Sequence, residues 1–455
     1  MEPWATGFYR PITALSVSID YIIWGLNPFG YNLTNLIYHV LVSVLFFLIM
    51  FSLTKGNLFI AWLSAIVFTT HPILANDVQV IPYRQDILPA FFMLLSFFLF
   101  LVYTSAGPLK KWCLMLSLLS FASALGSKET AIITPLIIFT YVIVFSNGQP
   151  YKEKLFKAVK VCLPFLLIAV LYVAWRTYLL HGIAGYGKSL QVSVSENIRN
   201  YFAYLLDPVE RLHINIRHIL SLLVLISLLY WGEIKRSFTD SIYGRLITLL
   251  LIWMLAPLMI FLFTLGFIDN RQAYIPSIPF SGIISVVFVR NLQSAINKIR
   301  VTPLSSLKNF TASAITLGLI AYLFIYSPLI KNYREVENCG KICKTVLNKL
   351  MEIVPALPPE TTVHIYNLPV NVYPKGTTPI TDGSCFENGN YKKFLNYYYP
   401  DNRVKLVPHY TIWNIDTDYP LNVNSDIKFE IKDKKDEGIV ELVIKLMNDR
   451  ITISQ

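Results

Sequence analysis

One stretch of the chain gathers charged side chains between two long apolar runs. It runs from His71 to Asp86, reads HPILANDVQVIPYRQD, and holds Asp77 and Arg84 as well. Ionisable groups packed between membrane spans are costly, so such a stretch is a candidate functional site. A carboxylate there is suited to take the proton from a hydroxyl, and a guanidinium is suited to hold a phosphate.

Three other short segments carry similar side chains at the edges of apolar runs. They read GFYRPITALSVSID, GSKET and IDNRQAYIPS. A histidine lies near the start of the first long apolar run, one helical turn after an asparagine, so both side chains share a helix face. The candidate residues in these places are Arg10, Asp20, His39, Lys128, Glu129, Arg271 and Tyr274.

Each candidate also has a purely structural interpretation. Asp86 would cap the helix that follows it, and Lys128 with Glu129 would form a plain short turn. His71 before a proline is typical of a helix end, and His39 of a hydrogen bond between helices. The sequence leaves both interpretations open at these positions.

The elements that must position these residues are membrane helices. Hydrophobic residues make up 54% of the 455 residues and charged residues 15%, whereas soluble domains have about a quarter charged. We predict an α-helical polytopic membrane protein with about ten spans. The expected spans are Leu33–Leu53, Leu58–Thr70, Ile87–Tyr103, Trp112–Leu125, Ala131–Phe145, Val159–Tyr178, Ile216–Trp231, Leu246–Gly266, Tyr274–Val289 and Phe310–Tyr326.

The net charge of +11 arises in residues 1–330, because residues 331–455 hold 16 basic and 16 acidic side chains. Basic loops favour the cytoplasm, and the pattern indicates no nucleic-acid partner. We assign one alternate set of loops to the cytoplasm: Lys55; Lys110 and Lys111; Lys152, Lys154, Lys157 and Lys160; Lys235, Arg236 and Arg245; Arg290, Lys298, Arg300 and Lys308. The four candidate segments then lie together on the outer face.

Residues 330–455 have the pattern of a small α/β soluble domain, which this orientation places on the outer face. Val336–Met351 has a helical apolar stripe, and Thr361–Tyr366 and Arg403–Val407 have strand patterns. Ile427–Ile431 and Ile439–Ile444 flank a polar turn and predict a hairpin.

The candidate segments resemble motifs of GT-C type membrane glycosyltransferases. The resemblance is to bacterial relatives of the protein O-mannosyltransferases, including the transmembrane O-mannosyltransferases that target cadherins, and it covers roughly residues 7–290. In FYRPITALSVSIDYIIWGLNPFGYNLTNLIYH the matching residues are Arg10, Pro11, Asp20, Gly25, Asn27, Pro28, Gly30, Leu33, Asn35 and His39. In HPILANDVQVIPYRQDIL they are His71, Pro72, Val78, Ile81, Arg84, Asp86 and Leu88, with Asn76 where the family has Glu. LGSKETAIITPL and DNRQAYIPS complete the set.

The resemblance implies transfer of a sugar from a polyprenyl-phosphate donor to a lipid, glycan or protein acceptor at the outer membrane face. It makes Asp20, Asp77 and Asp86 the predicted catalytic carboxylates, Arg10, Arg84, Lys128 and Arg271 the predicted contacts of the donor phosphate, and His39, His71, Glu129 and Tyr274 supporting residues. A divalent metal is compatible with the family, and the sequence does not identify one.

The start of the chain departs from the family pattern. Family members carry a first span and an acidic loop before the F-R-P-L motif, whereas this chain begins a few residues before Phe8. We therefore expect residues 1–32 to be a remnant of the first outer loop with an interfacial helix, and the enzyme to be truncated or inactive. Residues 33–329 would form the GT-C-like domain.

Two other function classes remain open. A transporter or flippase for a lipid-linked sugar would use the same charges, although the chain shows no internal repeat. A non-catalytic membrane scaffold would use residues 330–455 to bind a partner.

Overall fold

A computed structural model describes most of the helical part of the chain and five strands. The described residues are 9–105, 110–146, 148, 150–180, 194–206, 242–264, 270–298, 361–369, 404–411, 427–432, 440–447 and 450–454, with the single positions 314, 317, 318, 320, 321, 325, 348 and 351. The chain divides into two compact units, Met1–Lys331 and Asn332–Gln455.

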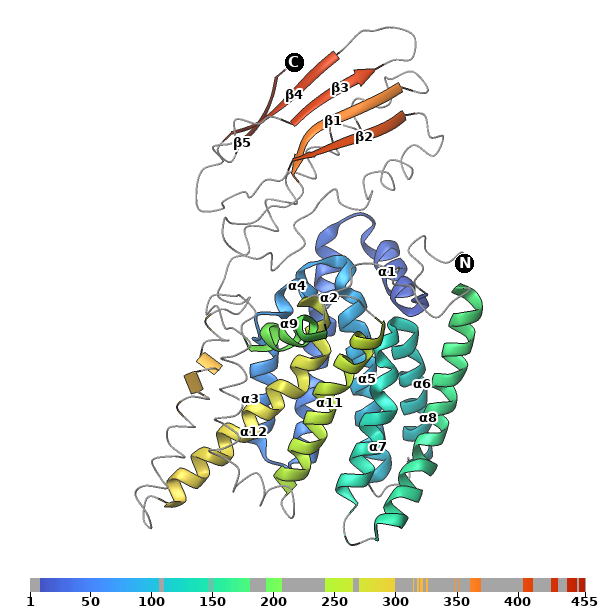
Figure 1. Ribbon diagram of the computed structural model, residues 1–455, viewed down its shortest axis with the longest axis vertical. Coiled ribbons are helices and arrows are strands. Elements are labelled where there is room, and N and C mark those ends of the chain that lie inside the picture. The colour runs from blue at the N-terminus through green and yellow to red at the C-terminus, as the bar shows by residue number, and fades with distance from the viewer. Residues whose placement is uncertain are drawn as a thin grey trace. The chain divides into compact units, whose positions relative to one another are not determined.

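The first unit is helical, and its long helices run side by side (Figure 1). Its elements are α1 (Pro11–Trp24), α2 (Pro28–Leu53), α3 (Leu58–Thr69), α4 (Leu74–Gln79), η1 (Ile81–Tyr83), α5 (Arg84–Thr104), α6 (Lys110–Ser127), η2 (Glu129–Ile133), α7 (Thr134–Phe145), α8 (Tyr151–Leu180), α9 (Val194–Leu206), α11 (Ile242–Thr264), η3 (Asn270–Ala273) and α12 (Tyr274–Lys298).

Five described segments are long and apolar enough to cross a membrane: Pro28–Leu53, Ile81–Thr104, Tyr151–Leu180, Ile242–Ile260 and Arg271–Gln293. The chain is therefore an integral, multi-pass membrane protein. The expected span Ile216–Trp231 and most of Phe310–Tyr326 lie outside the described residues, so the number ten stays a prediction.

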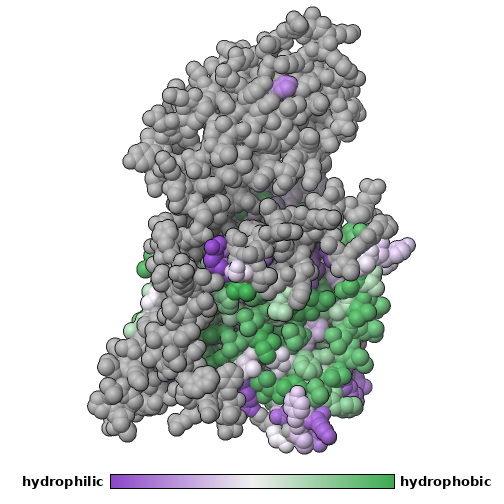
Figure 2. Space-filling view, viewed as in Figure 1, coloured by the Kyte–Doolittle hydropathy of each residue, from purple (hydrophilic) through white to green (hydrophobic). Residues whose placement is uncertain are grey.

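Apolar side chains both fill the bundle and cover its sides. Phe165 of α8 packs against Phe121 of α6 and Phe100 of α5, with ring centroids 5.7 and 6.2 Å apart. On the outside of α8, Leu163 and Val170 are more than half exposed. Figure 2 shows the apolar surface, with hydrophilic side chains mostly towards the ends of the helical unit. A surface of this kind is suited to lipid, where helices satisfy their own backbone hydrogen bonds.

The junction between α1 and α2 is built from a glycine, an asparagine and a proline. Gly25 ends α1 with a φ of +58°, in the region that favours glycine. The Asn27 side chain accepts a hydrogen bond from the Phe29 N–H at 3.1 Å, and Pro28 occupies the first turn of α2. These are standard signals for a helix start, so α2 begins before the predicted Leu33.

The ends of several helices meet at one end of the bundle, which we call the polar end. It comprises residues 10–35, 71–86, 126–133 and 270–274. On α1, the Thr13 hydroxyl donates to the Ser127 carbonyl oxygen at 3.0 Å. A Cβ on Gly126 would lie only 2.8 Å from the Ile12 side chain, so glycine permits the close approach of α1 to α6.

The second unit contains a five-stranded sheet. Its strands are β1 (Thr361–Pro369), β2 (Val404–Thr411), β3 (Ile427–Lys432), β4 (Val440–Met447) and β5 (Arg450–Ser454), in the order β2-β1-β3-β4-β5. Strands β1 and β2 are parallel and the other pairs antiparallel. Strands β3 and β4 pair across the predicted hairpin turn, whereas β5 was not predicted. Most of the helix expected over Val336–Met351 lies outside the described residues, so the α/β class of this unit stays a prediction.

Candidate functional site

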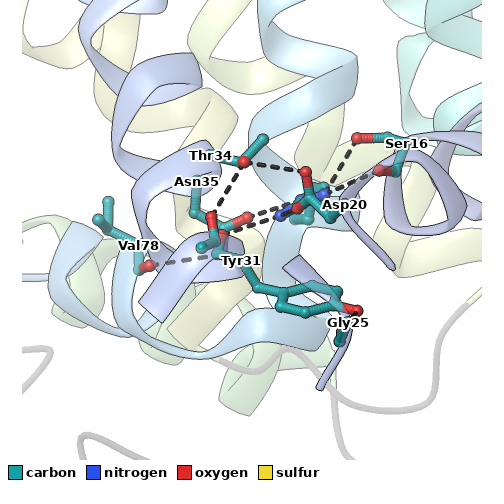
Figure 3. A network of polar contacts seen from close by, with 9 residues as sticks. Ser16, Asp20, Gly25, Tyr31, Thr34, Asn35 and Val78 are labelled. Atoms are coloured by element: carbon teal, nitrogen blue, oxygen red, sulfur yellow. Dashed lines mark hydrogen bonds and ion pairs between the residues drawn. The ribbon is translucent and has the colours of Figure 1, made fainter. Parts of the chain in front are cut away.

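Arg84 is completely buried, and its guanidinium contacts four of the residues that Figure 3 labels: Ser16, Asp20, Tyr31 and Asn35. Its Nε donates to Asn35 Oδ1 at 2.7 Å. Its Nη1 donates to the carbonyl and hydroxyl oxygens of Ser16 at 3.2 and 3.1 Å. Its Nη2 donates to the Tyr31 carbonyl oxygen at 2.9 Å and pairs with Asp20 Oδ2 at 2.5 Å. Arg84 therefore ties α5 to α1 and α2, and these contacts involve all three of its guanidinium nitrogens.

Asp20 is held from both sides. Its Oδ1 accepts a hydrogen bond from the Thr34 hydroxyl at 2.9 Å, and its Oδ2 pairs with Arg84. The Asn35 amide also donates to the Val78 carbonyl oxygen at 3.4 Å, which links this network to α4. The buried Asp20 carboxylate therefore serves as the counter-ion of Arg84.

A second buried ion pair joins α5 to the junction of α6 and η2. The Lys128 Nζ donates to Asp86 Oδ1. Asp86 Oδ2 is buried and has no hydrogen-bond partner among the described residues. The alternative interpretation, in which Asp86 caps a helix, does not hold, because α5 begins at Arg84 and Asp86 lies inside its first turn.

The charge state of Lys128 depends on its neighbours. Burial lowers the pKa of Lys128, and the nearby charges of Arg10 and Arg271 act in the same direction, whereas Asp86 and Glu129 oppose them. Lys128 is thus surrounded by two cations and two anions, and its pairing with Asp86 offsets part of the cost of its burial.

A third ion pair is partly open to solvent. Arg10 donates to both carboxylate oxygens of Glu129, from Nη2 at 2.8 Å and from Nε at 3.4 Å, and its Nη1 donates to Gln85. Burial alone would raise the pKa of Glu129, but Arg10 and Lys128 outweigh it and lower the pKa to about 2. Glu129 is therefore a carboxylate at neutral pH, and the plain-turn interpretation does not describe it.

The remaining predicted residues of the fourth segment meet the same end of the bundle. The buried Tyr274 hydroxyl and His39 Nδ1 form a hydrogen bond of 2.9 Å between α12 and α2. The carboxylates of Asp77 and Asp86 lie close enough to Tyr274 to interact with it electrostatically. The Arg271 guanidinium lies over the Tyr83 ring, 5.4 Å from its centroid.

His71 connects the bundle to α9 through a hydrogen bond. Its Nε2 donates to the Leu205 carbonyl oxygen at 3.1 Å, and its Nδ1 accepts from the Ile73 N–H at 3.3 Å. Burial lowers the pKa of His71 to about 4, against the opposing effect of the Leu205 hydrogen bond. The ring is therefore neutral, with the proton on Nε2, and its contacts are structural.

Sequence reasoning did not identify several residues on which these contacts depend. Ser16, Thr34 and Gln85 each contact a predicted charged side chain. Gln85 could have been found, because it lies between Arg84 and Asp86. Hydroxyl residues in apolar segments are too common to be distinguished by type.

Together the polar end brings the four predicted segments into contact. Among the described residues, no three His, Cys, Asp or Glu side chains are grouped to hold a metal ion. The charges instead pair with one another, and Asp86 Oδ2 is a carboxylate oxygen with unused acceptor capacity.

Comparison with known proteins gives partial matches. No protein-family profile matches the chain. The chain is 34% identical over 103 residues to "Protein O-mannosyl-transferase TMTC3" of Homo sapiens, covering 22% of this chain and 10% of that protein. It is 30% identical over 149 residues to "Protein O-mannosyl-transferase Tmtc1" of Drosophila melanogaster, covering 32% and 17%. The chain thus spans a small part of the curated relatives it matches, and it is similar to O-mannosyltransferases, as the motifs predicted.

Two solved structures are also similar. One is the archaeal oligosaccharyltransferase AglB from Archaeoglobus fulgidus in complex with an inhibitory peptide and a dolichol-phosphate (14% identity, TM-score 0.39, 74% of this chain and 50% of that chain). The other is ArnT from Cupriavidus metallidurans bound to undecaprenyl phosphate (13%, TM-score 0.39, 87% and 79%). Both scores are too low for either likeness to establish fold or function.

Proposed function

We propose that this chain is a membrane glycosyltransferase of the GT-C type, which moves a sugar from a polyprenyl-phosphate donor to an acceptor hydroxyl at the polar end. The observation that carries the proposal is the buried Lys128–Asp86 pair, whose carboxylate keeps one oxygen without a partner among the described residues. The similarity to O-mannosyltransferases supports it. We place the polar end at the outer face of the membrane.

The donor phosphate would be held by Lys128 and Arg271. Among the described residues, Asp86 is the acceptor found for Lys128, so the other N–H groups of the ammonium are available for phosphate oxygens. Arg271 is half-buried over the Tyr83 ring and acts electrostatically on Lys128. Two cations on one phosphate stabilise the charge that develops as the carrier leaves.

The carboxylate of Asp86 would act as the general base, with Asp77 as the second candidate. The base takes the proton of the acceptor hydroxyl as its oxygen attacks the anomeric carbon of the sugar. The bond between that carbon and the phosphate oxygen breaks, and the polyprenyl phosphate leaves with both electrons. Asp86 suits this task because Oδ2 is unpartnered among the described residues while Lys128 holds Oδ1.

The other predicted residues take positioning roles in this proposal. Arg84 and Asp20 are not assigned to substrate, because their hydrogen bonds and ion pair already occupy them. The His39–Tyr274 hydrogen bond would hold α12, and hence Arg271, against α2.

A transfer assay tests the proposal with the whole chain in its native membranes. Polyprenyl phosphates carrying tritiated mannose or tritiated glucose are supplied, and label is counted in the lipid, glycan and protein fractions. We expect label to move from donor to acceptor in the wild type, and Asp86→Asn to reduce the rate by at least a hundredfold, the lower range reported for loss of a general base. Glu153→Gln, an exposed acid on α8, is the matched control and leaves the rate unchanged.

The outcomes separate the function classes. If neither donor releases sugar to any fraction, the proposal of transfer is wrong, and movement of intact donor across the membrane would instead support a transporter. If Asp86→Asn is as active as the wild type while Asp77→Asn is inactive, the base is Asp77. Full activity of both variants would refute a carboxylate base in this segment.

A further inference from the structure

The beginning of α8 carries a concentrated positive charge. Its first ten residues read YKEKLFKAVK and hold four lysines and one acid, Glu153. Among the described residues, none of the four lysines has an acidic side chain within ion-pair distance. These lysines are Lys152, Lys154, Lys157 and Lys160. A positive patch without protein counter-ions is complementary to an anionic partner.

Large apolar side chains lie between these lysines and face outwards. Phe156 is 72% exposed, and Val159 is 49% exposed. On the following turns the same side of α8 exposes Leu163 and Val170, which continue the apolar surface of the bundle. A helix surface that alternates cations with exposed aromatic and aliphatic groups matches the boundary between lipid headgroups and acyl chains.

The patch lies one membrane thickness from the polar end. The charges of Glu129 and Arg10 act on Tyr172 of α8, so Tyr172 is close to the polar end. Lys154 precedes Tyr172 by a helical distance of about 27 Å, close to the roughly 30 Å of the hydrocarbon core. In a bilayer with the polar end at one surface, Lys154 would lie at the level of the opposite headgroups.

The start of α6 supplies a neighbouring cation at the same level. The Phe121 and Phe165 rings are 5.7 Å apart, and both helices run in the same direction from this end. About 15 Å back from these rings, α6 has Lys111 and Trp112, and α8 has Leu155. Lys111 is exposed, and Trp112 is 62% exposed. Tryptophan is enriched at membrane interfaces.

We propose that this surface is a binding site for the phosphate of anionic phospholipids. We call it the basic collar and define it as Lys111, Lys152, Lys154, Lys157 and Lys160. Lys157 and Lys160 lie one and two turns closer to the bilayer centre than Lys154, so their long side chains extend towards the headgroups to reach water. A lipid phosphate at the headgroup level then supplies the counter-ion for these lysines, while the acyl chain of the same lipid covers Phe156.

The site is distinct from the proposed transfer site, and its occupancy does not depend on catalysis. The proposed ligand is the phosphodiester group of a diacyl lipid. The same cations also attract free phosphate, so the binding measurement must distinguish the two. Binding is therefore measured with short-chain phosphatidylglycerol, with short-chain phosphatidylcholine as the neutral lipid and with inorganic phosphate as the free anion. Native mass spectrometry of the full chain in detergent reports the bound lipid at each concentration.

We expect phosphatidylglycerol to bind, and phosphatidylcholine and inorganic phosphate not to compete with it at equal concentration. The double substitution Lys157→Gln/Lys160→Gln weakens the affinity roughly thirtyfold, since each lysine near an anionic surface contributes about fivefold, or ~1 kcal/mol. The double substitution Lys157→Arg/Lys160→Arg keeps the charge and restores binding. Lys55→Gln removes an exposed cation outside the collar and leaves the affinity unchanged.

Three results would overturn the proposal. Equal binding of phosphatidylcholine shows that the headgroup charge is not recognised. Competition by inorganic phosphate at equal concentration shows a free-anion site. Unchanged phosphatidylglycerol affinity in the Lys157→Gln/Lys160→Gln variant, with an unaltered melting temperature, shows that the lipid binds elsewhere. In each case the transfer assay described for Asp86 is unaffected.

Discussion

Replacing Arg84 by lysine distinguishes a structural arginine from one that binds the donor phosphate. The guanidinium donates to four residues at once, two of them through backbone carbonyl oxygens. An ammonium is a single point of charge and cannot reproduce the planar fork of arginine. Lysine would therefore keep the charge opposite Asp20 but lose the hydrogen bonds to Asn35 and Ser16.

The size of the effect follows from burial. Removing one partner of a buried ion pair costs about 3–5 kcal/mol, because the other charge stays buried and unpaired. Arg84→Met should therefore destabilise the helical unit by this amount. Arg84→Lys retains the pair but leaves buried acceptors unsatisfied, at about 1–3 kcal/mol each. In domains of about 150–250 residues a loss of about 4 kcal/mol lowers the melting temperature by roughly 8–16 °C, and in the larger helical unit Met1–Lys331 it should lower it by less.

The assay is thermal unfolding in detergent, combined with donor titration at a temperature where every variant is folded. We expect Arg84→Lys and Arg84→Met to melt early and to keep the wild-type KM for the donor. Asp20→Asn should also melt early, and the double variant Asp20→Asn/Arg84→Met should cost less than the sum of the two single changes. A variant Arg84→Lys with a wild-type melting temperature, or Arg84→Met with a raised KM and normal stability, would refute the structural role.

Three further perturbations test individual contacts. Burial lowers the pKa of His71 from 6.5 to about 4. As the pH drops from about 6.5 to 4, the unfolded chain therefore takes up a proton at His71 before the folded chain does. The free energy of unfolding falls by about 3 kcal/mol over this range. His71→Gln keeps a donor for the Leu205 carbonyl and should flatten this melting profile. The hydroxyls of Ser96 and Ser117 each donate to the other's carbonyl oxygen, at 2.8 and 2.7 Å, so the double alanine variant should lose about 1 kcal/mol, whereas an unchanged melting temperature would show that these bonds contribute nothing. Glu129 has a pKa lowered to about 2, so its stabilising effect is complete above about pH 4.5. The melting difference between the wild type and Glu129→Gln should narrow as the pH falls from 4.5 towards 2.

The apolar runs of the sequence predict the main helices because lipid leaves a chain little choice. A segment without water must satisfy its own backbone hydrogen bonds, and helices do so locally. The expected runs beginning at Leu33, Ile87 and Val159 fall within α2, α5 and α8. Their starts were predicted late because hydropathy does not detect capping. Helix α2 starts at Pro28, which lies in a segment of turn-forming residues, and helix α5 starts at the charged residue Arg84.

The roles of the charged residues could not be predicted in the same way. The partners of Arg84 lie 49 to 68 positions away in the chain, and no local pattern chooses among the acids that could pair with it. Residue type alone made Arg84 a phosphate ligand and Asp20 a base. The structure pairs the two with each other and gives both hydrogen bonds to protein groups, contacts that depend on the packing of α1 across α2 and α5.

The three ion pairs form a closed circuit, and this has a consequence for ligand exchange. Asp20–Arg84 joins α1 to α5, Asp86–Lys128 joins α5 to the α6–η2 junction, and Arg10–Glu129 joins η2 back to α1. A single pair can open without detaching a helix, because each helix is still tied through the other two pairs. In the proposed reaction Lys128 binds the donor phosphate through its other N–H groups and keeps its bond to Asp86 Oδ1, so the circuit stays closed while Asp86 Oδ2 accepts the proton.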